Sequence, residues 1–343
     1  MNLNIYDVSA IVHTAVSGSK DETYYGYPIS GIKALWRRVS VDLISGEGVL
    51  LCFDSPTDKY ELVPTYKAGR AFNPIVASQI DSIYNDFEQA GFRCLKVENY
   101  EADDLIHWAA MANRKKYTNV NIYGNDYDLC HSVVGNVVFR SISPMVHMVN
   151  QSIFENAVER GSKVLFNTIS AKKSLCGCAS DKVPAIKLAN GLGGEALYNK
   201  FLEYYRENFN CFTYENSSSI TTFCKFLLES NLFSEEEVAE AYKNALVVYP
   251  KPLEQEINLT PSCLRDLDKE WLRSILAKYG LKDAAQVLRL KLFTPTEEQK
   301  AELIEKSNKL KNGIYSIDKN MQPTASLTEE VLQELEVFGD DDY

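Results

Sequence analysis

The sequence predicts an α/β fold: a mostly parallel sheet with helices on both faces, followed by a helical domain. In the first half of the chain, short β-branched runs alternate with amphipathic helical stretches, which is typical of parallel strands joined by helical crossovers. From about residue 169 the strand-like runs stop and only helical periodicity continues. A chain of 343 residues is long enough for two structural units.

The expected strands are short apolar runs at residues 3–6, 48–53, 93–97, 120–123 and 136–140. Helices are expected between and after them, at residues 29–44, 74–90, 102–115 and 151–160. The second unit shows helical patterns at residues 171–175, 196–205, 220–229, 235–248 and 268–279, with a last short helix ending at residue 292. We therefore assign residues 1–168 to an α/β domain and residues 169–293 to a helical domain.

The last segment, residues 294–343, differs in composition from the rest of the chain. It holds twelve acidic and five basic residues, and so carries −7 of the net charge of −11. This composition predicts a flexible acidic tail that does not pack on the body. Its apolar stretch, residues 331–338, predicts an amphipathic or extended docking segment, with a purely solubilising tail as the alternative.

Composition also excludes several classes of protein. No run of about 18 uncharged apolar residues is present, so no membrane span is expected. The N-terminus is neither basic nor strongly apolar, which predicts a cytoplasmic protein. Eight scattered cysteines without a Cys-x-x-Cys pair indicate free thiols rather than a zinc site. The negative net charge does not exclude a nucleic-acid partner, because the excess lies in the tail and in clustered carboxylates.

Acidic side chains stand where the expected strands end. Asp7 and Asp54 end the first two strands, and Asp126 and Asp128 follow the fourth. Because the carboxyl ends of parallel strands meet at one edge of a sheet, these side chains are expected to converge. The structural alternative is that each carboxylate only caps a helix or opens a turn.

A further acidic run, Glu101, Asp103 and Asp104, stands at a strand-to-helix transition. Adjacent like charges at one helix start repel one another unless a cation joins them. Oxygen ligands without a matching set of His or Cys select Mg²⁺ or Mn²⁺. Two such ions roughly 3.5–4 Å apart are a standard device for phosphodiester cleavage. The carboxylates therefore predict a two-ion site.

Two basic residues follow the second strand. Lys67 and Arg70 are three positions apart, so they share one face if the segment is helical. A solvated surface is the alternative, but their place just after Asp54 favours contact with a phosphate.

In their order and spacing these motifs resemble those of the 5′-nuclease, or flap endonuclease, superfamily. That family includes the nuclease domain of bacterial DNA polymerase I, free-standing phage 5′ exonucleases and phage ribonuclease H. The resemblance covers about residues 1–293 and rests on segments 6–9, 53–54, 64–70, 100–104, 125–129 and 177–184. It implies a PIN-like 5′-nuclease domain followed by a DNA-binding domain with a helix-three-turn-helix motif.

The resemblance also implies roles for single residues. Two Mg²⁺ ions, with Mn²⁺ as a substitute, would be held by Asp7, Asp54, Glu101, Asp103, Asp104, Asp126, Asp128 and Asp181. Lys67 and Arg70 would hold the scissile phosphate, and Tyr66 would stack on a base. The hairpin glycines would hold the duplex backbone, with K⁺ bound there, and are Gly191, Gly193 and Gly194.

The chain departs from the family pattern at several positions. Cys178 stands where the family has an aspartate of the second metal site, and Lys182 replaces its asparagine. The hairpin arrives about three residues late, with Glu195 where a lysine is usual. A sulfur ligand suits Mg²⁺ poorly, so we expect a weakened second site or a preference for Mn²⁺.

The function implied by the resemblance is a structure-specific 5′-3′ nuclease, an exonuclease or flap endonuclease of DNA replication. Its partner would be DNA with a 5′ flap, a nick or an RNA primer end, bound by a monomer. The resemblance to phage members also implies a replication protein as the partner of the acidic tail. A chain without a polymerase resembles the phage versions, which act in the host cytoplasm. One alternative is a catalytically weakened member that binds branched DNA as a recruiting protein. Another is a ribonuclease of the PIN fold, which the hairpin and the segment 66–70 disfavour.

Overall fold

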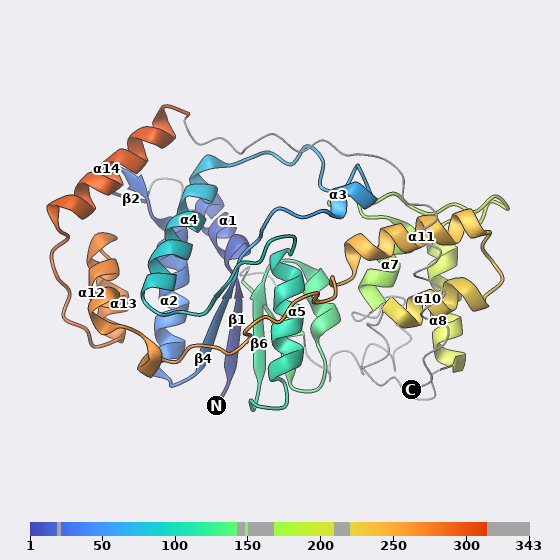
Figure 1. Cartoon of the computed structure of the whole chain (residues 1–343), viewed down its shortest axis with the longest axis horizontal. Helices are drawn as coiled ribbons and strands as arrows, with labels where there is room; N and C mark the ends of the chain where they lie inside the picture. The colour runs from blue at the N-terminus through green and yellow to red at the C-terminus, as the bar shows by residue number, and fades with distance from the viewer. Residues whose placement is uncertain (19–21, 143–147, 150–167, 209–219, 314–343) are drawn as a thin grey trace.

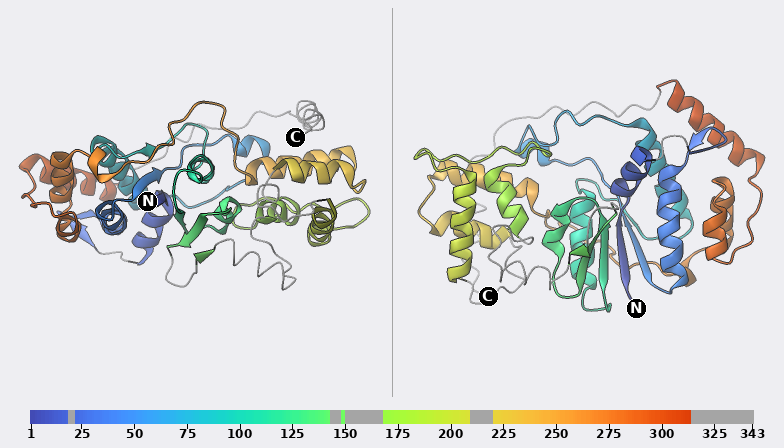
Figure 2. Two further views of the ribbon diagram at one scale, coloured as in Figure 1. Left: turned by 90° about the horizontal axis from the view of Figure 1, so that it is seen from below. Right: turned by 180° about the vertical axis from the view of Figure 1, so that it is seen from behind.

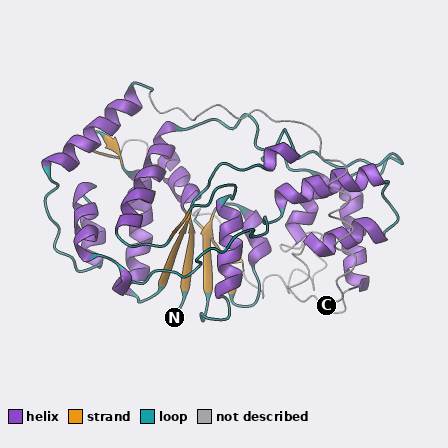
Figure 3. Cartoon of the chain, viewed as in Figure 1, coloured by secondary structure: helices purple, strands orange, loops and turns teal. Residues whose placement is uncertain are grey.

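The computed structural model describes residues 1–18, 22–142, 148–149, 168–208 and 220–313. At its centre lies a six-stranded sheet in the order β5–β4–β1–β6–β7–β8, in which only β8 runs antiparallel to its neighbour (Figures 1 and 3). The strands are β1 (Leu3–Asp7), β4 (Gly48–Cys52), β5 (Cys94–Leu95), β6 (Val120–Gly124), β7 (Val137–Ser141) and β8 (Met148–Val149). The predicted parallel α/β sheet is confirmed.

Helices cover both faces of this sheet because its strands are apolar on both sides. Leu3 and Ile5 of β1 pack in one cluster with α5 (Ala102–Asn113). Tyr6, on the opposite face, packs in a second cluster with helices on that side. Those helices are α1 (Val8–Gly18), α2 (Ser30–Ile44) and α4 (Pro74–Gln89). The two-residue alternation along β1 therefore builds two cores.

Shorter elements connect these layers. They are the hairpin β2 (Thr23–Tyr24) and β3 (Tyr27–Pro28), the helix α3 (Lys59–Leu62) and the 3₁₀ helix η1 (Tyr127–Ser132). The sequence did not predict α1, because its β-branched run follows β1 without a break. Predicted helix 151–160 lies outside the described residues.

Within the described residues, the unit on the right of Figure 1 contains the helices α7 (Ile169–Cys176), α8 (Gly194–Asn208), α10 (Ile220–Glu229) and α11 (Glu235–Val248). Leu175, Phe201 and Tyr242 join the same apolar cluster as α5 and β1. The helical unit is thus fused to one face of the sheet by a continuous core.

The chain then returns to the opposite end of the molecule (Figures 1 and 2). Ser262 exchanges backbone hydrogen bonds of 2.8 and 2.9 Å with Val49. Beyond the 3₁₀ helix η3 (Leu264–Asp266), the chain forms α12 (Lys269–Lys278) and α13 (Lys282–Val287), and Leu272 and Leu276 pack in the cluster of Trp36. Assigning residues 169–293 to one helical domain is therefore wrong for α12 and α13, which belong to the α/β half.

The prediction of an unpacked tail from residue 294 is also wrong for its first part. Residues Glu297–Lys311 form the helix α14, which begins with a capping box between Thr296 and Gln299. Leu303 is fully buried, and the Ser307 hydroxyl donates to the Gly26 carbonyl at 2.8 Å. The charges occupy the exposed face, so net composition hid a packing face. Residues 314–343, which include the predicted docking segment, lie outside the described residues. No helix in the described ranges is both long and apolar enough to cross a bilayer.

Candidate active site

Three carboxylates stand at the ends of the three central strands β4, β1 and β6. Asp7 is the last residue of β1, Asp54 follows β4 by two residues and Asp126 follows β6 by two. Each uses one oxygen to accept a backbone N–H, from Ala10 at 2.8 Å, Ala102 at 3.0 Å and Asp128 at 3.0 Å, respectively. Each carboxylate therefore does accept a local backbone hydrogen bond, as the capping alternative expects, but only one of its two oxygens takes part in that bond.

Asp103, in the first turn of α5, completes a carboxylate cluster with Asp7, Asp54 and Asp126. Burial and the neighbouring charges of Asp54 and Asp126 raise the pKa of Asp7 to about 7. Burial and the charges of Asp7 and Asp126 also raise the pKa of Asp103 well above its usual range. Asp54 and Asp126 are exposed, so the cluster opens to solvent. Such repulsion is relieved by a cation with oxygen ligands, which fits Mg²⁺ or Mn²⁺.

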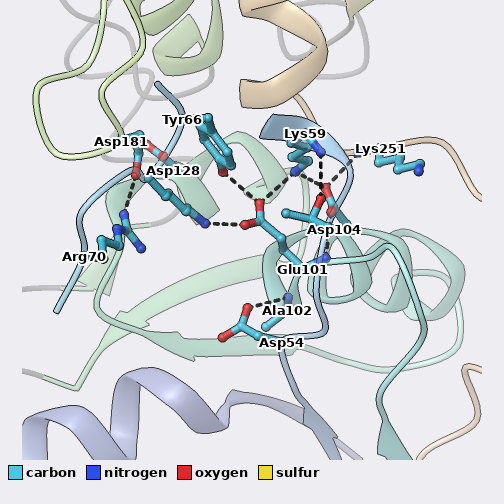
Figure 4. Close-up of polar contacts among 12 residues, drawn as sticks. Asp54, Lys59, Tyr66, Arg70, Glu101, Ala102, Asp104, Asp128, Asp181 and Lys251 are labelled. Atoms are coloured by element: carbon cyan, nitrogen blue, oxygen red, sulfur yellow. Dashed lines mark hydrogen bonds and ion pairs between the residues drawn. The ribbon is translucent and has the colours of Figure 1, made fainter. Parts of the chain in front are cut away.

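Glu101, two residues before Asp103, already has cationic partners. Its carboxylate accepts hydrogen bonds from Lys59 at 2.9 Å, from the Tyr66 hydroxyl at 2.8 Å and from Lys67 (Figure 4). Burial opposes its ionisation, but the ammonium groups of Lys59 and Lys67 lower the pKa of Glu101 to about 2. Glu101 therefore holds these three side chains in place, and this geometry does not make it a direct metal ligand.

Asp104 is likewise engaged in a structural network. It is 1 % exposed, and it accepts from Lys59 at 3.1 Å and from the backbone N–H groups of Lys251 at 2.8 Å and Glu101 at 3.0 Å. These bonds close the capping box of α5 and fix the segment after α11 to the sheet. The expectation that Asp104 is a metal ligand is therefore corrected.

Tyr66 does not have the place that base stacking requires. Its side chain packs in a small cluster with Val63, Val183 and Val247, and the whole residue is 8 % exposed. Its hydroxyl is directed at Glu101. A ring buried to this extent is not free to stack on a nucleobase, so Tyr66 is better placed to position Glu101.

Lys67 and Arg70 lie on a series of turns rather than on the expected helix. The Lys67 N–H donates to the Asp181 carbonyl at 2.7 Å, and its backbone has φ +50°. Its ammonium contacts Glu101 and feels the charges of Asp103 and Asp54. Arg70 donates to Asp181 at 2.6 Å while half of its side chain stays exposed. Both cations thus border the carboxylates.

Asp128 and Asp181 form a lysine-bridged pair beside the cluster. Lys173 of α7 donates to Asp128 and, at 3.0 Å, to Asp181. The Cys178 thiol donates to the same Asp181 oxygen at 3.1 Å. Asp103, Asp128 and Asp181 line one pocket, so the pair and the cluster face a common space.

In the described part of the chain, no three His, Cys, Asp or Glu side chains are already arranged to hold a metal ion. The carboxylates of the cluster repel one another, and those of the pair turn toward Lys173. An ion at the cluster would have to draw its ligands together. The mutual repulsion that a bound cation would relieve is that among Asp7, Asp54, Asp103 and Asp126.

Known proteins show which family shares this arrangement. Residues 9–159 match the family model described as 5′-3′ exonuclease, N-terminal resolvase-like domain. The 5′-3′ exonuclease of Aquifex aeolicus is 30 % identical over 189 residues, which is 53 % of this chain and 62 % of that protein. Over residues 9–159 this chain is thus similar to the 5′-3′ exonuclease family. The predicted resemblance is confirmed.

Other relatives extend this similarity. The 5′-3′ exonuclease of Mycoplasma pneumoniae is 24 % identical over 241 residues, 69 % of this chain and 79 % of that protein. A structure of the T5 5′-exonuclease with bound divalent metal ions (zinc) has 13 % identity and a TM-score of 0.50, covering 90 % of this chain and all of that one. The latter shows the shared fold. The chain spans less than two thirds of the length of the Aquifex relative.

The hairpin glycines differ in their surroundings. Gly191 has φ +86° and donates to the Leu188 carbonyl at 2.8 Å, and both Gly191 and Gly193 border open space. Gly194 is buried where α8 begins, and a Cβ there would lie 2.4 Å from the Leu175 carbonyl oxygen. Gly194 therefore serves helix packing rather than the predicted DNA contact.

Sequence reasoning missed two lysines of the site. Lys59 is 3 % exposed among acidic side chains, and Lys173 joins the two carboxylates of the pair. The only signal was that buried carboxylates require counter-charges. Nothing in the spacing of either lysine identified it as the partner.

Proposed function

We propose that this protein is a divalent-metal-dependent 5′-3′ nuclease that hydrolyses phosphodiester bonds at DNA ends carrying a 5′ flap, a nick or an RNA primer. One observation carries the proposal. The carboxylates at the ends of β1, β4 and β6 lie so close to Asp103 that their mutual repulsion raises the pKa values of Asp7 and Asp103, and the cations Lys67 and Arg70 lie beside them. The match of residues 9–159 to a family model named for 5′-3′ exonucleases supports it.

The metal ion would be held by Asp7, Asp54, Asp103 and Asp126. A bound Mg²⁺ or Mn²⁺ supplies an acidified water and neutralises charge on the phosphate. Lys67, held by Glu101 at the edge of the cluster, places a positive charge where a phosphate entering the site would lie. Glu101 and Tyr66 keep that lysine in place from behind.

DNA contacts are proposed along the exposed cations near the cluster. Arg70 is half exposed. The ammonium group of Lys182 lies next to Gly69, 3.2 Å from where a Cβ atom on that glycine would be, so Lys182 is a neighbour of Arg70. The exposed turn at Gly191 and Gly193 offers backbone groups to a duplex. Binding of K⁺ at this turn and contact of the acidic tail with a replication protein remain predictions.

A 5′-labelled flap duplex tests the proposal with Mg²⁺, Mn²⁺ or EDTA in parallel reactions. We expect cleavage near the junction with either metal and none with EDTA. Asp103→Asn is the matched inactive control, because it removes one charge of the cluster without touching the buried Lys59 network. Comparing DNA and RNA 5′ segments on the same duplex separates primer removal from flap cleavage.

The second candidate is a weakened member that binds branched DNA without turnover. The lysine and the thiol at the lysine-bridged pair favour it, because they stand among groups expected to hold an ion. Tight flap binding without cleavage in any metal would establish this candidate. Cleavage of single-stranded RNA alone would instead indicate a PIN-type ribonuclease.

A further inference from the structure

The ammonium group of Lys173 occupies the centre of the lysine-bridged pair. It reaches the pair from α7, contacts Asp128 and lies 3.0 Å from Asp181 Oδ2. The three side chains are between 9 % and 18 % exposed, so little water separates them. One fixed positive charge therefore already lies between two carboxylates.

Both carboxylate oxygens of Asp181 already accept hydrogen bonds from protein donors. Oδ2 accepts from both Lys173 and the Cys178 thiol, and Oδ1 accepts from Arg70 at 2.6 Å. Mg²⁺ requires near-octahedral oxygen ligands, and a thiol is a poor substitute for a carboxylate. Among the described residues, Asp128 Oδ1 is the one oxygen of this pair without a hydrogen-bond donor, which is too little to hold a second Mg²⁺ while Lys173 stays in place.

We propose that Lys173 takes the place of a second metal ion, so that this nuclease works with one divalent ion at the carboxylate cluster and one ammonium built into α7. This inference rests on the proposed nuclease function. Hydrolysis adds water across a P–O bond, and Lys173 contributes only positive charge next to the phosphate, with no proton transfer required of it. Cys178 belongs to the same arrangement, because its thiol donates to Asp181 where a carboxylate would add unwanted charge.

A divalent ion bound between Asp128 and Asp181 would be repelled by the Lys173 ammonium. The number of ions bound per chain therefore distinguishes a one-ion site from a two-ion site. Mn²⁺ bound per chain can be counted by equilibrium dialysis and by the loss of the free-ion paramagnetic resonance signal, without any substrate. We expect one ion for the wild-type protein. Lys172→Ala is the matched control, since Lys172 is the adjacent lysine of α7 and pairs with the exposed Glu195; it should also bind one ion.

The double variant Lys173→Ala, Cys178→Asp removes the ammonium and supplies an oxygen ligand. It should bind two ions, and its Mg²⁺ dependence of cleavage should become steeper. Two ions on the wild-type protein, or one on a folded double variant, would overturn the inference while leaving the nuclease proposal intact. No bound ion together with no cleavage would overturn the nuclease proposal itself.

Conservative and neutral replacements of Lys173 give an independent readout. Lys173→Arg keeps the charge and should keep most of the single-turnover rate. Lys173→Met keeps an unbranched side chain of nearly the same length without the charge, and should lower that rate on the order of 10²-fold or more, as removal of a preorganised charge does. Equal rates for the two variants would overturn the role of the ammonium, whatever the ion count.

Discussion

Asp103 and Asp104 are adjacent in α5, yet their carboxyl groups have opposite surroundings. The Asp104 carboxylate lies 3.1 Å from the Lys59 ammonium and accepts two backbone N–H groups. Asp103 faces the charges of Asp7 and Asp126 instead. An aspartate thus stabilises the fold at position 104, whereas the aspartate at position 103 destabilises the metal-free fold by repulsion from neighbouring carboxylates.

Replacing each aspartate by asparagine should therefore change stability in opposite directions. In EDTA, Asp103→Asn should raise the melting temperature because repulsion falls, and it should abolish cleavage. Asp104→Asn should destabilise by roughly 3 kcal/mol, since it leaves the buried Lys59 ammonium with one anionic partner fewer. Denaturant unfolding of both variants measures this, and equal shifts of the same sign would contradict the assignment of their roles.

In the metal-free protein, Asp7 should contribute stability that is lost as pH rises from about 4 to about 7. The folded state holds a proton on Asp7, whose pKa is raised to about 7, more tightly than the unfolded state does. Below this range Glu101, with its pKa lowered to about 2, loses its stabilising charge as it is protonated. The summed contribution of Asp7 and Glu101 should therefore be greatest near pH 4–5.

Saturating Mg²⁺ should remove the decline on the alkaline side, because the ion binds the ionised cluster in the folded state only. Melting temperatures across this pH range, with EDTA or Mg²⁺, provide the measurement. Parallel curves in the two conditions would show that no ion reaches these carboxylates.

Lys67→Ala should lower the single-turnover cleavage rate on the order of 10²-fold, with a smaller loss of flap affinity, because its charge matters most in the transition state. Lys182→Ala is the comparison on the exposed rim. It should weaken binding and reduce the salt dependence of affinity by about one unit of slope, at unchanged rate. A pure affinity loss in Lys67→Ala would move that lysine to the same rim role.

Two truncations test the division of the C-terminal segment. Removing residues 314–343 should leave flap cleavage intact, whereas a chain ending at residue 293 loses α14 and should unfold at lower temperature. Leu303→Ala should destabilise by roughly 2–5 kcal/mol, as expected for a fully buried leucine. Unchanged melting of Leu303→Ala would mean that α14 does not hold the α/β half together.

The sequence predicted those parts of the site that topology alone determines. Asp7, Asp54 and Asp126 converge because β4, β1 and β6 are parallel neighbours, and alternation of strands and helices was sufficient to infer that. The side of a helix start on which a carboxylate lies depends on tertiary contacts. Adjacent acidic letters therefore could not separate Asp103 from Asp104.

The remaining differences have the same origin in side-chain environment. A family motif identifies Tyr66 but not the apolar cluster that encloses its ring. Net charge described residues 294–313 as a tail because it ignores the single face on which Leu303 lies. Lys59 and Lys173 become visible only when the carboxylates they neutralise are placed in space.

The central claim is that the carboxylate cluster holds a divalent ion that makes this chain a nuclease. Single-turnover cleavage of a 5′-labelled flap duplex by the wild-type protein and Asp103→Asn, at saturating Mg²⁺ and equal occupancy of DNA, tests it most directly. We predict cleavage by the wild-type protein and a loss on the order of 10³-fold or more in the variant. Equal cleavage by a folded Asp103→Asn variant would contradict the account.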